Sequence, residues 1–429
     1  MDATDARKRR LHGLIDLARA SRGWSKAQLA KVLERDPTKL YPESGNPKAD
    51  FLIKLAEVLE WPVADLIETV WGPQLPGAAA AVGAEKSEPK PAVGAGSYEE
   101  LFGQARSAHQ KGDYRQVVSL SRLMYSVASN EDHKAVACSV EASGWDGLGR
   151  YVQEVEACKR GLQHRPENPI RRNQLRAVLA NAWYSLWELT PALGTAELLA
   201  NWYEKNPPKT DLDWKRPAFV HYVRGHTHRR MAFTEPELRQ EHLLAAEADL
   251  KQSAEMHESL SIKLNAPQLA GIANTCRGGL LEIDVELGRR NAADTINEIV
   301  AKVDAADIGQ ATGDWLESHG WWCIFGSDLA VRHLKGRELQ ETTRHLTSKA
   351  LAIADKANNW AMRERVFTLQ FALHQTITDL TGLDIDFPIN DSDKSLITAT
   401  MGRFPSFRSV GWQILETAKV VPAKQEGGR

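Results

Sequence analysis

Positive charge near the N-terminus is the first chemically informative pattern in this chain of 429 residues. Between Arg7 and Lys48 there are 11 Lys and Arg residues against 4 acidic ones, although the whole chain carries a formal net charge of −2. From Ala49 to Gly72 the balance reverses to one lysine and five acids. Cationic side chains gathered on one segment can neutralise phosphates and release counterions. The pattern fits a local nucleic-acid contact and, equally, a solvated basic surface.

Histidines and cysteines offer a second kind of chemistry, metal binding, and their spacing argues against it. His221 and His226 are five residues apart, which does not place two imidazoles on one helical face, and neither these nor His228 are joined by a glutamate. The cysteines form no CxxC pair, which argues against a zinc site or a disulfide framework: Cys138, Cys158, Cys276 and Cys323. No HExxH, P-loop, GxSxG or Gly-rich dinucleotide turn occurs. The sequence therefore predicts no metal, no cofactor and no enzymatic activity.

Composition places the chain among folded proteins of two to three domains. Hydrophobic residues make up 42% and charged residues 26% of the chain. No apolar run approaches membrane-spanning length, and the start MDATDARKRRL lacks the apolar segment of a signal peptide. With dispersed cysteines, this predicts a cytoplasmic protein without a membrane partner.

Residues 1–72 must supply the elements that position the basic side chains. Leucines at helical spacing predict a first helix from about residue 6 to residue 20. Ser25 and Gln28 fit a capping box at the start of a second helix, and Asp36-Pro37 is a further start signal. Phe51, Leu52, Leu55, Ala56 and Leu59 form one face of a fourth helix, and a short fifth follows.

This stretch resembles the lambda-repressor-like, Xre-type helix-turn-helix family over about residues 11 to 70. The motifs that carry the resemblance are RGWS at 22–25, Leu29-Ala30, Glu43-x-Gly45 and LIKLAEVLEWPVADLI at 52–67. In that family the second helix of the motif lies in the major groove of double-stranded DNA. The resemblance implies that Ser25 and Lys26 approach the DNA backbone and that Lys48 contacts phosphate. It further implies that three residues face the groove: Thr38, Lys39 and Tyr41.

Pro42 departs from the family pattern, which has a large apolar residue inside the recognition helix. A proline there removes an amide donor and pushes Tyr41 away from helical geometry. We therefore expect a recognition helix of only about Pro37 to Tyr41. Two interpretations follow. Either one turn and a loop contact the major groove of DNA, or residues 1–72, called the head from here on, are an interaction module that no longer reads DNA.

After an Ala/Gly/Pro-rich stretch at 73–96, expected to be a flexible linker, the chain shows an internal repeat. Ala105-x6-Gly112-Asp113-Tyr114 recurs as Ala142-x6-Gly149-Arg150-Tyr151, with 37 residues between the glycines. The repeat resembles a tetratricopeptide-repeat array over about residues 97 to 375, with the later units irregular. The predicted fold class is thus all-α, with an α-solenoid over residues 97–380 and a capping segment and tail at 381–429. A generic helical bundle with chance periodicity is the alternative.

Such arrays bind peptides or protein segments on a concave surface lined by the first helix of each repeat. Asn181 and Asn274 lie at similar offsets before Gly194 and Gly288, and an asparagine amide can pair with a peptide backbone. Three neighbours complete the expected peptide site, as a carboxylate clamp and an apolar wall: Arg224, Arg277 and Trp183. Alternatively, the asparagines cap or bridge neighbouring helices.

Together the two resemblances predict a DNA-binding transcription regulator with a dimerising repeat body. In architecture it resembles the peptide-sensing quorum regulators, and occupancy of the groove would change the distance between two heads on paired half-sites. The competing hypothesis is a non-enzymatic scaffold or adaptor with a degenerate helix-turn-helix. Pro42 and the long linker motivate that hypothesis.

Overall fold

The computed structural model describes residues 3–43, 47–71, 96–383 and 387–421. These residues form α-helices and three short 3-10 helices and contain no strand, so the predicted all-α class is confirmed. None of the helices within the described ranges is long and apolar enough to cross a membrane. The chain divides into two compact units, one from residues 1–88 with 371–429 and one from residues 89–370. Residues 73–95 of the predicted linker lie outside the described ranges.

The first unit begins with α1 (Ala3–Arg22), α2 (Lys26–Val32), the 3-10 helix η1 (Pro37–Lys39), α3 (Ala49–Leu59) and α4 (Val63–Trp71). Helix α1 packs against α2, α3 and α4, and buried apolar side chains from all four fill the space between them. The largest of these that are fully buried include Leu11, Leu14, Leu17, Leu29 and Phe51, and Leu40 after η1 joins them. The helical spacing of leucines therefore identified the core of this part.

Three later elements belong to the first unit: the first of them packs on α1, and the other two pack on the first. They are α19 (Asp391–Met401), η3 (Pro405–Phe407) and α20 (Arg408–Thr417). The Trp61 indole, only 4% exposed, donates its Nε1–H to the Thr398 carbonyl at 3.0 Å. Ser395 Oγ donates to the Ser21 carbonyl, which joins α19 to the end of α1.

Two ion pairs add to this contact, Arg403 with Glu60 at 3.5 Å and Arg408 with Asp65. We expected a capping segment over residues 381–429, and Phe387 does pack on Phe371 and His374 of α18 (Trp360–Thr381), with ring centres 5.8 and 5.3 Å apart. Helix α19 packs on the head instead. The physical reason is apolar surface, because the buried side chains of Ile397, Met401 and Phe404 need a hydrophobic partner.

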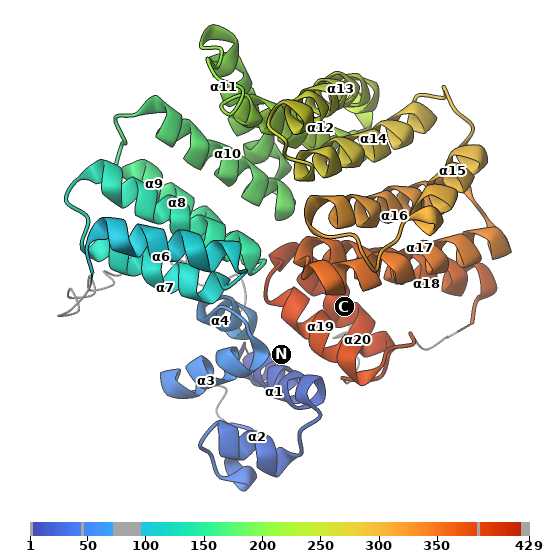
Figure 1. The fold of residues 1–429 in the computed structure, drawn as a ribbon. Coiled ribbons are helices and arrows are strands. Elements are labelled where there is room, and N and C mark those ends of the chain that lie inside the picture. The colour runs from blue at the N-terminus through green and yellow to red at the C-terminus, as the bar shows by residue number, and fades with distance from the viewer. Residues whose placement is uncertain (1–2, 44–46, 72–95, 384–386, 422–429) are drawn as a thin grey trace. The chain divides into compact units, whose positions relative to one another are not determined.

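The second unit contains α6 (Tyr98–Gln110) through α17, with α18 (Trp360–Thr381) continuing into the first unit from Phe371. Between them lie α7 (Tyr114–Ser126), α8 (Glu131–Gly147), α9 (Tyr151–Gln163), α10 (Pro169–Ser185), α11 (Leu189–Lys205), α12 (Lys215–Thr234), η2 (Pro236–Leu238), α13 (Arg239–Lys263), α14 (Gln268–Glu286), α15 (Ala292–Ala305), α16 (Gly313–His333) and α17 (Gly336–Ala357). Each helix from α6 to α14 packs on the next along the chain, as Figure 1 shows.

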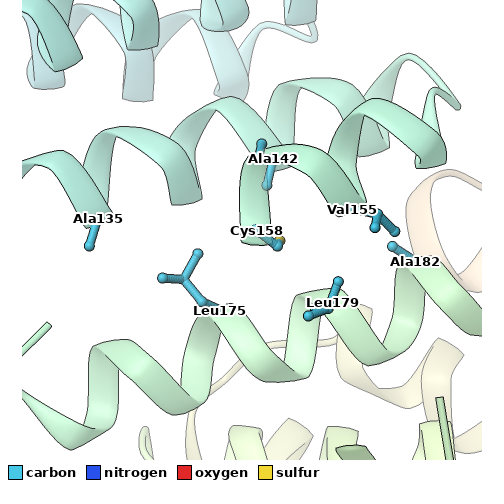
Figure 2. Close-up of a cluster of buried hydrophobic side chains, with 8 residues drawn as sticks. Ala135, Ala142, Val155, Cys158, Leu175, Leu179 and Ala182 are labelled. Carbon is cyan, nitrogen blue, oxygen red and sulfur yellow. The ribbon is translucent and has the colours of Figure 1, made fainter. Parts of the chain in front are cut away.

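Small residues and branched apolar residues alternate where these helices meet. In Figure 2, Leu175 and Leu179 of α10 point towards Ala142 of α8 and towards Val155 and Cys158 of α9. All eight members of this buried cluster are less than a tenth exposed. The cluster shows how one helix pair covers the apolar face of the next, which is what a stacked helical array requires.

The turns between paired helices repeat the same backbone geometry. Gly112, Gly149, Trp187 and Gly288 all have φ between +64° and +73°. In each turn the following amide donates to the carbonyl five residues back at 2.8–3.0 Å, which is the longer hydrogen bond of a Schellman cap. In the turn between α10 and α11, Trp187 therefore occupies the position that Gly112 and Gly149 occupy in the earlier turns. Gly194 lies inside α11 with open space around it.

The first turns of α18 close the array onto two of these repeat turns. A Cβ on Gly149 would lie 2.5 Å from Trp360 Cδ1, so Trp360 packs directly on that glycine. Trp187 Nε1 donates to Glu364 Oε2 at 3.3 Å. The same helix bonds to α16 through Arg365, which pairs with Asp328 at 3.1 Å. Residues 360–365 therefore bridge early and late members of the second unit.

Candidate functional site

Capping interactions fix the basic segment of the head. Ser25 Oγ accepts from the Gln28 amide at 3.3 Å, and Gln28 Oε1 accepts from the Ser25 amide at 2.8 Å, so the predicted capping box is confirmed. Asp36 Oδ1 accepts from both the amide and the hydroxyl of Thr38, at 2.7 and 2.6 Å. The element that follows is a single 3-10 turn, Pro37–Lys39, shorter than the predicted helix to Tyr41. Both caps involve a side chain to which the resemblance assigned a DNA contact.

The cations of the head fall into two sets. Several make internal contacts: Arg10 donates to the Val70 carbonyl, Arg22 to Val58 and Glu60, and Lys54 pairs with Glu34. Lys26, Lys39 and Lys48, like Lys31, are exposed and form no ion pair within the described residues. Lys26 Nζ lies 5.5 Å from the centre of the Tyr41 ring, which places the start of α2 beside the end of η1.

Tyr41 is held on α1 and is half-buried. Its hydroxyl donates to Asp16 Oδ1 at 2.5 Å and accepts from Arg19 Nη1 at 2.9 Å. Burial, followed by the bond to Asp16, raises the pKa of Tyr41. The next residue, Pro42, lies 3.0 Å from His12 Nε2 through its carbonyl oxygen. The polypeptide that leaves η1 is therefore fixed to α1 at two successive residues.

The five residues predicted to hold a peptide lie in different surroundings. Arg224 makes a bidentate ion pair with Asp249 at 2.6 and 2.7 Å, joining α12 to α13. Arg277 pairs with Glu258 at 2.5 Å. Asn274 Nδ2 donates to Ser318 Oγ at 2.9 Å, and its carbonyl accepts from Trp322 Nε1. These three side chains join neighbouring helices, which for Asn274 is the second of the two roles that the sequence left open.

Asn181 and Trp183 both lie on α10, but only Trp183 packs against buried apolar clusters. Trp183 is half-buried against two apolar clusters, with Lys159 Nζ 5.5 Å from its ring centre. Asn181 is half-exposed and follows Val178 by three residues, so the two lie on the same face of α10. Among the described residues, no side-chain hydrogen bond or ion pair joins Asn181 to the other four.

The histidines near α12 are also dispersed. His221 Nδ1 lies 2.8 Å from Asp249, while His228 Nδ1 lies 2.9 Å from His242 Nδ1. His226 is buried between aromatic rings, and burial lowers its pKa well below the usual value. Across the described ranges no three His, Cys, Asp or Glu residues are grouped so that they could hold a metal ion.

An aromatic and guanidinium cluster surrounds the unusual turn residue Trp187. The Arg230 guanidinium lies 4.1 Å from the Trp187 ring centre and 3.8 Å from that of Tyr184, and it donates to the Tyr184 carbonyl at 2.6 Å. Burial lowers the pKa of Arg230 to about 10. Arg365 lies over the same indole at 4.8 Å. No local motif indicates this cluster, although the period of 37 to 38 residues from Gly112 and Gly149 points to residue 187.

A groove on α10, α12, α13 and α14 was also missed by sequence reasoning. This open groove has a volume of about 280 Å³, and its lining includes Val178, Phe219, Ile272, Lys215 and His257. His257 is 1% exposed, and its Nε2 atom has no hydrogen-bond partner. The only sequence signal for this groove is the helical spacing of Gln174, Val178 and Asn181, which places these three residues on one face of α10.

Neither the known protein-family models nor the curated proteins contain a match to this chain.

Proposed function

We propose that this protein is a DNA-binding transcription regulator whose N-terminal head contacts double-stranded DNA in the manner of a helix-turn-helix domain. The observation that carries the proposal is the set of exposed lysines, Lys26, Lys39 and Lys48, which have no ion-pair partner among the described residues while nearby arginines are bound internally. Unpaired cations beside a capped helix start are suited to phosphate oxygens.

The shape of the recognition element determines what kind of DNA contact is expected. A three-residue 3-10 turn offers few side chains to base edges, and Thr38 and Tyr41 already bond to Asp36 and Asp16. Phosphate contacts therefore supply most of the affinity, and Lys39 is the side chain best placed to reach a base. We expect strong salt dependence and modest sequence preference.

The repeat-like second unit is proposed to bring a second partner and a second copy of the chain. Support comes from the matched turns at Gly112, Gly149 and Trp187, because a helical array of the tetratricopeptide type would repeat its turn geometry in this way. Arrays of this kind hold peptide or protein segments, and two heads in a homodimer would meet paired half-sites. The site for a peptide signal includes Asn181 rather than the paired Arg224 and Arg277.

The test is a fluorescence-anisotropy titration of labelled duplex DNA with the full chain at several salt concentrations. Replacing Lys26, Lys39 or Lys48 with alanine is expected to reduce the slope of log K against log salt by about 0.9 for each phosphate that the variant no longer neutralises. The matched control is Lys209→Ala, an exposed lysine of the second unit. Binding that is insensitive to salt and to all three head variants would refute the proposal.

One observation favours a second candidate, a non-enzymatic scaffold or adaptor. Tyr41 and Pro42 are bonded to α1 through Asp16 and His12, so the segment after η1 is not open to a groove. In that case purification of the tagged chain from native lysate would recover a stoichiometric protein partner and no DNA. Recovery of DNA by the wild type but not by Lys39→Ala would instead favour the regulator.

A further inference from the structure

The groove of the second unit combines an apolar floor with one buried hydrogen-bond acceptor, His257 Nε2, that nothing in the described part of the protein uses. Val178, Phe219 and Ile272 are half-buried side chains on three different helices, α10, α12 and α14. His257 of α13 lines the same groove. The volume of this open groove, about 280 Å³, is close to the lower end of small-molecule sites.

Hydrogen bonding fixes which nitrogen of His257 carries the proton. Ser253 Oγ donates to the Ala218 carbonyl at 3.0 Å, so its proton is already used. His257 Nδ1 lies 2.9 Å from the Ser253 carbonyl, which can only accept, so Nδ1 is the protonated nitrogen. Nε2 is therefore a bare acceptor, buried and without a partner. Burial lowers the pKa of His257 to about 4, which keeps the ring neutral at pH 7.

Two positively charged side chains, Lys215 and Arg216, line the groove, and only one of them is paired with an acid. Arg216 pairs with Asp213 at 2.5 Å. Lys215, at the start of α12, has no ion pair within the described part of the chain. A ligand that fits would thus present an anionic group to Lys215, an apolar body to the floor and an N–H or O–H donor to His257 Nε2. A buried acceptor without a donor destabilises the unbound protein, so a ligand that supplies the donor removes this cost when it binds.

We infer that this groove binds a small aromatic or aliphatic acid that carries an O–H or N–H donor at the end opposite its carboxylate. The size of the groove favours a small molecule over an extended peptide. A peptide buried there would bring an N–H and a C=O group with almost every residue, and the lining offers four polar side chains to pair with them: Gln174, Lys215, Arg216 and His257. The inference does not depend on DNA binding by the head.

The test is isothermal titration calorimetry of the full chain with para-hydroxyphenylpropanoate and with phenylpropanoate. The hydroxylated acid is expected to bind about fivefold more tightly, because only its phenol can donate to His257 Nε2. Lys215→Glu is expected to weaken binding at least about tenfold by opposing the carboxylate, and Ile272→Trp to abolish it by filling the groove. The control Lys209→Glu, outside the groove, leaves binding unchanged.

His257→Phe is expected to make the two acids bind equally, and the comparison on the wild-type chain stands if that variant does not fold. The inference is overturned if neither acid binds below roughly 1 mM, if Lys215→Glu and Ile272→Trp bind like the wild type, or if a peptide binds in the groove and the acids do not. A wild-type chain that binds DNA but neither acid overturns this inference alone.

Discussion

The Tyr41 hydroxyl donates a 2.5 Å hydrogen bond to Asp16 on α1, across 25 residues of sequence. Arg19 completes the arrangement by donating to the same hydroxyl. The side chain that family position assigns to the DNA groove is thus part of the internal structure of the head. Its ring still borders the Lys26 ammonium, so its effect on DNA binding would be indirect.

We predict that Tyr41→Phe lowers the free energy of unfolding of the head by about 1–2 kcal/mol, because Asp16 and Arg19 lose a half-buried hydrogen-bond partner. Chemical denaturation measures the change. The same variant should alter DNA affinity less than Lys39→Ala does. If Tyr41→Phe lowered DNA affinity more than Lys39→Ala while stability stayed unchanged, Tyr41 would contact the DNA groove directly.

A second prediction concerns Gly402, which packs under the Trp61 indole. A Cβ there would lie 2.5 Å from Trp61 Cδ1 and 2.8 Å from the Glu60 carbonyl oxygen, and that backbone atom cannot move aside. Gly402→Ala is expected to destabilise the first unit by about 1–3 kcal/mol, measured by thermal melting. The control Gly103→Ala lies in the interior of α6 with open space around it and should stabilise by up to about 1 kcal/mol.

The repeat turns allow a matched comparison of two glycines. Gly149 and Gly112 have φ of +64° and +73°, so alanine carries a similar backbone cost of about 1–2 kcal/mol at both. Only at Gly149 does the new Cβ also meet Trp360, at 2.5 Å. Gly149→Ala should therefore cost about 1–3 kcal/mol more than Gly112→Ala. Equal costs in denaturant unfolding would mean that α18 does not close on this turn.

A fourth prediction is a pH dependence of stability at Glu317. Burial, then the charges of Asp314 and Asp146, raises the pKa of Glu317 to about 7, although Asn359 Nδ2 donates to it at 2.9 Å. Between the unfolded value near 4.5 and about 7 the folded state binds more protons, so this group destabilises the fold as pH rises through that window.

Glu317→Gln removes the titration while keeping an acceptor for Asn359. Relative to the wild type, the variant should gain about 1–3 kcal/mol of stability between pH 5 and pH 7.5, read from unfolding free energies at the two values. A gain of the same size at both pH values would show that the charge of Glu317 is not the cause.

Local signals in the sequence predicted local structure well. Ser25 and Gln28 form the expected capping box, Asp36 caps the turn that begins at Pro37, and leucines at helical spacing fill the core of the head. Gly112 and Gly149 occupy left-handed turn positions because a residue without a Cβ adopts positive φ at little cost. Such features depend on residues within one or two turns of each other.

Features that depend on distant residues could not be predicted in the same way. No pattern around Trp61 indicates that Thr398 will accept its indole hydrogen, and no motif at His257 shows that a groove will form beside it. Trp187 escaped prediction because a large residue at positive φ is rare, so a glycine elsewhere fitted the repeat pattern better. Partners for Arg224 and Arg277 likewise appear only when helices are paired.

The contact between α19 and the head also sets an order of events during synthesis. Thr398 is made 337 residues after Trp61, so at ribosomal rates of about 5–20 residues per second its partner waits roughly 17–67 s. Until then the indole and the adjoining apolar surface of α1 lack their cover. A nascent or prematurely terminated chain would thus carry a head without its α19 contact. The head is complete only in chains that have been translated through α19.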